Sequence, residues 1–345
     1  MARQRTGRSG PSSTPVESRP RPSSARAARA GLGPDPVGGG TRPPAGVSYP
    51  ESLRDTAATP GLPDSGLHGL SLVFAAIAGY LIVYLGGTHA VALAGWWSTG
   101  RQQAYSDFYA LAVTRFASPW GIWAAHLGLG LLVVGAWAAY RFHHRRRLAW
   151  LWSVMPGVRW RYGVVCLAVA LVVFGGYAAL AFRRGAGWDA PGDWVWYLVP
   201  IIVSTPFQAL GEEVLFRGYL MQALGLVWAR PVWPILASAV LFAVFHGAQN
   251  PALFVSRLVF GLLAGALVWR TGGLEAGIAA HVANNLGAFG LALITGQLQG
   301  SRTVTELTWA AAFGDVALFA VFAALAWGIG AAMRLPRRVP AVVER

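Results

Sequence analysis

The sequence predicts an all-α membrane protein, a polytopic bundle of about eight transmembrane helices with a disordered N-terminal tail. Of its 345 residues, 55% are hydrophobic and only 12% are charged, and the mean hydropathy is +0.46. A soluble globular domain carries about twice that share of charged residues. The apolar residues gather in stretches of about 17 to 25 residues, which as helices cross about 30 Å of hydrocarbon. We expect helices because an unpaired backbone amide in lipid costs several kcal/mol.

The first segment, residues 1–65, is predicted to be a disordered basic tail on the cytoplasmic side of the cell membrane. It is rich in Pro, Gly, Ser, Thr and Arg, and it contains no apolar run. The first apolar stretch begins only at Leu70. The tail is therefore expected to be neither a cleaved signal peptide nor a standard export signal, and its expected neighbour is the anionic cytoplasmic leaflet.

The remaining chain divides into three parts that share long apolar stretches separated by short polar breaks. Residues 66–195 are the N-terminal transmembrane helices, residues 196–296 carry the candidate catalytic helices, and residues 297–345 hold the last transmembrane helix and a basic C-terminal tail. The predicted spans lie near 70–87, 119–140, 163–182, 196–228, 232–248, 252–270, 273–296 and 306–333. Pro206 interrupts the long fourth stretch, which allows either one kinked helix or a helix with a separate elbow.

Orientation in the membrane follows from the arginines, which supply all 28 basic residues and a formal net charge of +14. They concentrate in the N-terminal tail, in the segment 141–147 and around 334–338. With eight spans these three regions lie on one side, so the positive-inside rule places both termini in the cytoplasm. Because the arginines flank apolar segments, we expect the lipid bilayer and not nucleic acid as the partner. The oligomeric state stays open.

Ionisable residues inside the predicted spans are candidates for function, because an ionised group at mid-bilayer costs roughly 3 kcal/mol or more. For four of them we expect structural hydrogen bonds between helices, with Arg257 and Asp315 as a candidate ion pair. These four are His126, Arg257, Glu275 and Asp315. The others fall into three clusters between residues 212 and 285, and they are Glu212, Glu213, Arg217, His246 and His281, with Asn284 and Asn285 beside the last histidine.

Helical spacing decides which residues of these clusters share a face. Glu213 and Arg217 are four residues apart and are expected to pair, whereas Glu212 points roughly 100° away and has no partner in its own helix. Phe242 and His246 are also one turn apart in the sequence FAVFH. The same four-residue spacing recurs between His281 and Asn285 in HVANN.

Together the three clusters contain the groups that peptide hydrolysis requires. A carboxylate accepts a proton from water, an imidazole shares or relays that proton, and an amide N–H stabilises an oxyanion. Two histidines and one glutamate are also a common ligand set for catalytic zinc with an open fourth position, and Glu212, His246 and His281 would be those ligands. Composition alone leaves both chemistries open.

The order EEVLFRGYL, FAVFH, HVANN resembles the three motifs of the CAAX-protease and bacteriocin-processing family of intramembrane proteases, also called the Abi family. Its motifs read EExxxR, FxxxH and HxxxN, and the sequence matches every defining position. The resemblance covers roughly residues 196–296. It implies an eight-helix endopeptidase that cuts a membrane-associated protein or peptide near the cytoplasmic side of the membrane.

The resemblance also implies a role for each matching residue. Glu212 and His246 would activate the water, and His281 and Asn285 would hold the oxyanion. Glu213 and Arg217 would brace these groups from behind, together with Phe242 of the second motif. Family members are often labelled metalloproteases, so Zn²⁺ on Glu212, His246 and His281 is one interpretation. A metal-free glutamate mechanism is preferred, because asparagine is a better oxyanion donor than zinc ligand.

The substrate is less defined than the site. The founding activity of the family removes three residues after a prenylated cysteine, but an arginine-only, alanine-rich and glycine-rich chain is typical of a GC-rich bacterial genome. Bacteria generally lack prenylated CAAX proteins, so the expected substrate is a membrane-bound or secreted peptide or a regulatory membrane protein. Two alternatives are a non-catalytic relative that acts as an immunity factor or scaffold, and a proton-coupled transporter that uses the same buried carboxylate and histidines.

Overall fold

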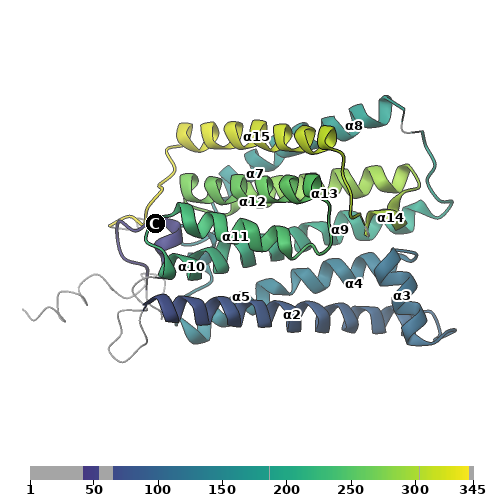
Figure 1. The fold of residues 1–345 in the computed structure, drawn as a ribbon, viewed down its shortest axis with the longest axis horizontal. Coiled ribbons are helices and arrows are strands. Elements are labelled where there is room, and N and C mark those ends of the chain that lie inside the picture. Colours follow the sequence, from purple (N-terminus) through teal and green to yellow (C-terminus); the bar gives the residue numbers. More distant parts are fainter. Residues whose placement is uncertain (1–41, 54–64, 186, 303, 342–345) are drawn as a thin grey trace, which may run out of the picture.

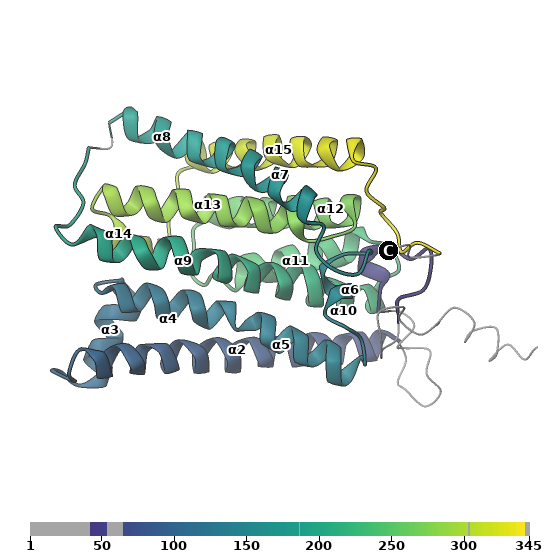
Figure 2. The same cartoon turned by 180° about the vertical axis from the view of Figure 1, so that it is seen from behind.

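The computed structural model describes residues 42–53, 65–185, 187–302 and 304–341. Within these residues the helices run side by side along the long axis of the molecule, as two opposite views show (Figure 1, Figure 2). Apart from two isolated β-bridges, the regular structure of the described residues is helical. The predicted all-α class is therefore confirmed.

Seven helical stretches are long and apolar enough to cross a membrane, and one shorter apolar helix, Val232–Val244, accompanies them. This arrangement agrees with the prediction of about eight spans in a polytopic membrane protein. The seven stretches are Gly66–Ser98, Pro119–His143, Trp160–Arg183, Trp194–Val227, Pro251–Thr271, Glu275–Ile294 and Trp309–Ala332.

Several of these stretches contain more than one element, because short π-helices interrupt the α-helical hydrogen bonding. In chain order the described elements are η1 (Tyr49–Glu51), α2 (Ser65–Ser98), α3 (Tyr105–Arg115), α4 (Pro119–Gly130), α5 (Leu132–Ala138), η3 (Ala139–His143), α6 (Ala149–Trp152), α7 (Trp160–Ala170), η4 (Leu171–Gly175), α8 (Gly176–Arg183), α9 (Trp194–Glu213), η5 (Val214–Leu220), α10 (Met221–Val227), α11 (Val232–Val244), α12 (Pro251–Thr271), α13 (Glu275–Ile294), α14 (Leu298–Ser301) and α15 (Trp309–Ala332). η1 is a 3-10 helix, and η3, η4 and η5 are π-helices.

The first helix is longer than the sequence predicts, and a further helix follows it. α2 continues to Ser98 and is followed by Gly100, whose φ of +75° favours glycine. The next helix, α3, is too short and too polar to be recognised as a span. It packs its buried face, which includes Phe108, against α2 and α4. The helix was therefore missed because tertiary packing, and not a long apolar run, stabilises it.

The long fourth stretch is continuous, and Pro206 does not break it. Pro206 lies inside α9, which runs from Trp194 to Glu213. The departure from α-helical geometry comes later, in the π-helix η5, which begins directly after Glu213. Such π-turns are rare and occur often at functional sites. The structure thus has one continuous helix at Pro206 and no separate elbow. The helical pitch changes later, within the first motif.

Part of the predicted disordered tail is folded. The segment 42–53 contains the 3-10 helix Tyr49–Glu51, and the side chains of Tyr49 and Leu53 are both 0% exposed. The Tyr49 hydroxyl donates to the carbonyl of Leu151. Two apolar anchors within an otherwise polar segment explain this correction, because together they bury enough surface to order a short stretch. The rest of the predicted tail, 1–41 and 54–64, lies outside the described residues.

A turn at residues 228–231 sets the depth of the first two motifs. α10 ends before this turn and α11 begins after it, and the two helices pack against each other. Glu212 lies before the turn and His246 after it, at almost the same number of residues from it, on two antiparallel helical segments. Since each helical residue advances about 1.5 Å, both side chains reach a similar depth. The predicted span 232–248 places His246 near its far end, whereas the short α11 places His246 at the depth of Glu212.

Close helix packing also positions the first motif. A Cβ atom added to Gly211 would collide with the backbone carbonyl of Leu129 in α4. We expect Gly211→Ala to push α9 away from α4 and to lower the free energy of unfolding by about 1–3 kcal/mol. Thermal unfolding in detergent measures this loss. The control is Gly86→Ala in α2, where a Cβ would meet nothing within 4 Å, and equal unfolding temperatures for the two variants would contradict the prediction.

Candidate active site

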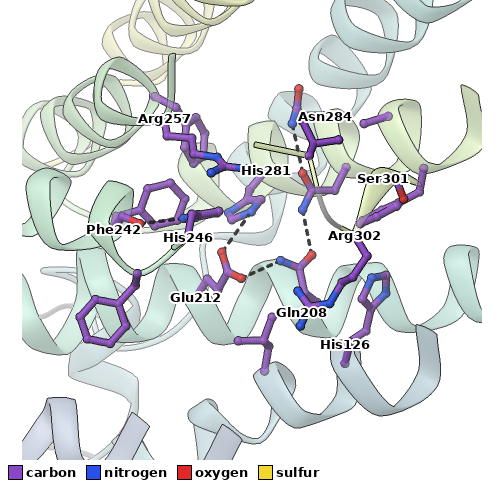
Figure 3. Close-up of a pocket in the computed structure, with 18 of the residues that line it drawn as sticks. His126, Gln208, Glu212, Phe242, His246, Arg257, His281, Asn284, Ser301 and Arg302 are labelled. Atoms are coloured by element: carbon purple, nitrogen blue, oxygen red, sulfur yellow. Dashed lines mark hydrogen bonds and ion pairs between the residues drawn. The ribbon is translucent and has the colours of Figure 1, made fainter. Parts of the chain in front are cut away.

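The three motifs meet around one cavity of about 580 Å³. Its walls come from α2, α4, α9, η5, α11, α12, α13, α14 and α15 and from the connections next to α3, α11 and α14. Figure 3 shows the labelled side chains around it. The predicted catalytic residues that line the cavity are Glu212, His246, His281 and Asn285. Sequence spacing could place these residues on helix faces, and the structure places the faces together.

Glu212 presents one oriented and one available carboxylate oxygen. The side chain is buried, and Oε1 accepts a hydrogen bond of 2.9 Å from Nε2 of Gln208. The other oxygen, Oε2, lies 3.5 Å from Nε2 of His281 and has no hydrogen-bond partner among the described residues. The expectation that Glu212 lacks any partner in its own helix is wrong, because Gln208 is one turn earlier. It does lack a charged partner there.

His246 lies just beyond the last turn of α11 and is exposed on the cavity wall. Its Nδ1 atom is 2.7 Å from the backbone carbonyl of Phe242, so Nδ1 carries the proton and donates. Nε2 of the neutral ring is then an acceptor. The chain turns immediately afterwards at Gly247, whose φ is +79°. The backbone carbonyl of Phe242, four residues before His246 in the FxxxH motif, thus fixes the tautomer of the His246 ring.

Glu213 and Arg217 form a fully buried layer behind the cavity, and this layer contacts His281, which lines the cavity. The Glu213 and Arg217 side chains are 0% and 1% exposed, and Arg217 Nη1 donates to Glu213 Oε1 at 2.9 Å. The same oxygen lies 2.9 Å from Nδ1 of His281. The predicted pair is present, and it also orients the imidazole of the third motif. The guanidinium of Arg217 stacks over the ring of Phe242, 4.0 Å from its centroid, and over Phe260 at 4.9 Å.

Gln208 is the site residue that the sequence analysis missed. Its amide nitrogen donates to Glu212 (Figure 3), and its amide oxygen accepts a hydrogen bond of 2.8 Å from Nδ2 of Asn285. Oδ1 of Asn285 accepts from Asn284 at 3.1 Å. Gln208 thus connects the first motif to the third. Its position one turn before Glu212, in an apolar stretch, was the available signal.

All four residues expected to be structural make a hydrogen bond to another helix or to a connection between helices. Glu275 forms an ion pair of 2.5 Å with Arg159, away from the cavity. His126 Nδ1 lies 3.0 Å from the Ser204 hydroxyl. The ring of His126 also lines the cavity. These contacts agree with a structural role for both residues.

The expected pair of Arg257 and Asp315 is not formed. Arg257 Nη1 donates to Gln249 Oε1 at 2.8 Å, and the Ser256 hydroxyl donates to Asp315 at 3.3 Å. The short loop before α12 brings Gln249 within reach of Arg257, which satisfies the guanidinium locally. Both Arg257 and Asp315 line the cavity. A charged residue facing a polar cavity does not need an ion-pair partner.

The described residues do not offer a three-ligand metal site. No group of three His, Cys, Asp or Glu side chains among them is placed to hold one ion. Glu212, His246 and His281 share the cavity without forming such a group. The donor set therefore does not fit the zinc interpretation in this arrangement.

Comparisons with known proteins agree with the motifs. Residues 194–287 match the family model of the Type II CAAX prenyl endopeptidase Rce1-like proteins. The chain is also 28% identical over 183 residues to the uncharacterized protein YyaK of Bacillus subtilis (strain 168), a match that covers 48% of this chain and 59% of that relative. No solved structure matches. The helices at residues 194–287 of this polytopic protein are therefore similar to those of CAAX-type intramembrane proteases, in agreement with the three motifs.

Proposed function

We propose that the chain is an intramembrane endopeptidase that hydrolyses a peptide bond of a membrane-associated protein or peptide in the cell membrane. One observation supports this most. The free Oε2 of Glu212 lies in the same cavity as His246, whose Nδ1 proton is held by a backbone carbonyl. A carboxylate and a neutral imidazole on one cavity are the pair needed to bind and deprotonate a water.

The proposed reaction begins with a water held between Glu212 Oε2 and His246 Nε2. Glu212 takes a proton from this water as its oxygen attacks the carbonyl carbon of the peptide bond. A tetrahedral intermediate forms, with the negative charge on the former carbonyl oxygen. The protonated Glu212 then gives its proton to the peptide nitrogen as the C–N bond breaks. The products are a carboxylic acid and an amine, and the carboxylate of Glu212 is regenerated.

Asn285 and His281 are proposed to stabilise the oxyanion. The amide of Asn285 uses one N–H for Gln208 and keeps a second N–H available for a substrate. When doubly protonated, His281 donates through Nε2, while Glu213 holds the proton on Nδ1. The buried carboxylate behind the ring stabilises its positive charge as the oxyanion develops.

The test is to compare the peptide termini in membranes that contain the wild-type protein with those in membranes that contain Glu212→Gln. Termini present only with the wild-type protein would identify substrate bonds. A metal-free mechanism predicts that a purified protein retains cleavage of such a peptide after chelation, and the metal content of the same sample is measured in parallel. A phenotype that persists in Glu212→Gln would contradict the proposal and would favour a non-catalytic protein.

Gln208 is expected to act as a positioning residue. Gln208→Leu removes the hydrogen bonds to Glu212 and Asn285, and we expect kcat to fall by about 10- to 100-fold with little change in KM. The control is Gln222→Leu, because Gln222 is also a fully buried glutamine and its oxygen is bonded to Tyr140 outside the cavity. An unchanged kcat in Gln208→Leu, or an equal loss in both variants, would contradict the positioning role.

A further inference from the structure

One end of the bundle is strongly positive. It carries both described chain ends and the connections 144–159, 228–231 and 272–274, and we call it the arginine-rich end. Within the part of the chain that the structure describes, the acidic residues at this end are Glu51 and Glu275. The described arginines at this end are Arg42, Arg141, Arg145, Arg146, Arg147, Arg159, Arg161, Arg230, Arg270, Arg334, Arg337 and Arg338.

The opposite end, formed by the connections 99–118, 184–193 and 295–308, is nearly balanced in charge. Its arginines are Arg101, Arg115, Arg183, Arg184 and Arg302, and its acidic residues are Asp107, Asp189, Asp193 and Glu306. The positive-inside rule counts arginines in short connections near the membrane. It therefore assigns the arginine-rich end to the cytoplasm and the opposite end to the extracytoplasmic side.

The cavity extends from Glu212 toward the opposite end. Along α13 its lining continues past Asn285 to Ala288 and Phe289, in the direction of the helix end at Ile294. At the end of α14 and directly after it, the lining includes Ser301, Arg302 and Val304. The exposed residues among those that line the cavity are His246, Gly247, Ala288, Arg302 and Val304. They lie at the level of Glu212 or nearer the opposite end.

Between Glu212 and the arginine-rich end the bundle is filled. The buried pair of Glu213 and Arg217 comes first, and the side chains of Trp150 and Leu151, both 1% exposed, lie beyond it. Backbone hydrogen bonds fasten this layer, including Leu274 N to the carbonyl of Trp152 at 3.0 Å. None of these residues lines the cavity.

We infer that the cavity opens to the extracytoplasmic side of the membrane, so that a peptide reaches Glu212 from that side. The claim that the entering peptide is a substrate rests on the proposed function. The direction in which the cavity opens rests on the difference in charge between the two ends of the bundle. It assigns the substrate class as a segment of an exported peptide, or of a membrane protein, that lies in the outer half of the bilayer. The family resemblance predicts cleavage near the cytoplasmic side, and the combination of arginines and cavity in this chain favours the other side.

Cysteine labelling tests the direction without using catalysis. The chain has one cysteine, the buried Cys166, so Cys166→Ala gives a background for single cysteines. The probes are Val304→Cys at the mouth and Ala288→Cys in the cavity, and the matched uncharged control is Ala45→Cys at the arginine-rich end. We expect a membrane-impermeant thiosulfonate added to intact cells to label the two probes at least tenfold faster than the control. Permeabilisation should expose the control.

The opposite labelling pattern would overturn the inference, whatever the protein does catalytically. A second arm uses two single-span reporter proteins that carry the same cleavable segment in the outer or the inner half of the span. Cleavage of the outer reporter alone is expected, and cleavage of the inner reporter alone would also overturn the inference. If neither reporter is cut while the labelling is as expected, the direction of opening stands and the proposed peptidase activity fails.

Discussion

Glu212→Gln is expected to abolish peptide cleavage while leaving the bundle folded. The substituted amide has nearly the same shape as the carboxylate and keeps an oxygen that can accept the Gln208 hydrogen bond. It cannot accept a proton from water. Since a positioned general base contributes typically 10²- to 10⁴-fold, and since the proposed mechanism offers no second carboxylate facing the water, we expect kcat to fall by about 10³- to 10⁴-fold.

The measurement compares initial cleavage rates of equal amounts of folded protein in lipid nanodiscs. Thermal unfolding of each variant confirms that the fold is retained. Glu275→Gln is the matched control, because it makes the same substitution at another buried glutamate that is paired with Arg159 away from the cavity. This control is expected to lower stability and to leave the rate per folded molecule unchanged. A similar rate for Glu212→Gln and the wild-type protein would contradict the role of Glu212 as base.

Much of the site could be predicted because it depends on short spacings within single helices. The four-residue intervals alone place Glu213 beside Arg217, and the structure confirms this pair. The same rule places His246 one turn after Phe242, although it does not reveal that the contact is made by a backbone carbonyl. The all-α class and the membrane-spanning helices follow from hydropathy, which depends on composition over long windows.

The features that could not be predicted depend on contacts between distant parts of the chain. Gln208 has no charge, and its role becomes evident only from the hydrogen bond that it accepts from Asn285, which lies far along the sequence. Residues 42–53 resemble a disordered tail in composition, but Tyr49 is buried and donates a hydrogen bond to Leu151 in α6, which is 102 residues away. The π-helix after Glu213 has no sequence signature, because it results from the packing of neighbouring helices.

The second large effect is expected from the buried ion pair behind the site. Arg217→Met leaves the carboxylate of Glu213, which is 0% exposed, without its guanidinium partner. Breaking a buried pair in this way typically costs about 3–5 kcal/mol, because the remaining charge is desolvated and uncompensated. We expect the variant to lose about that much free energy of unfolding in detergent. Arg159→Met is the control, because its partly exposed pair with Glu275 should cost less.

The double variant Glu213→Gln with Arg217→Met separates stability from catalysis. Neither charge remains, so we expect most of the lost free energy of unfolding to return. Cleavage should stay low, since Nδ1 of His281 then faces a neutral amide that stabilises a positive imidazole less than a carboxylate does. A double variant as unstable as Arg217→Met would contradict the desolvation argument. A double variant with full cleavage would show that Glu213 acts only on stability and that His281 needs no charged partner to hold the oxyanion.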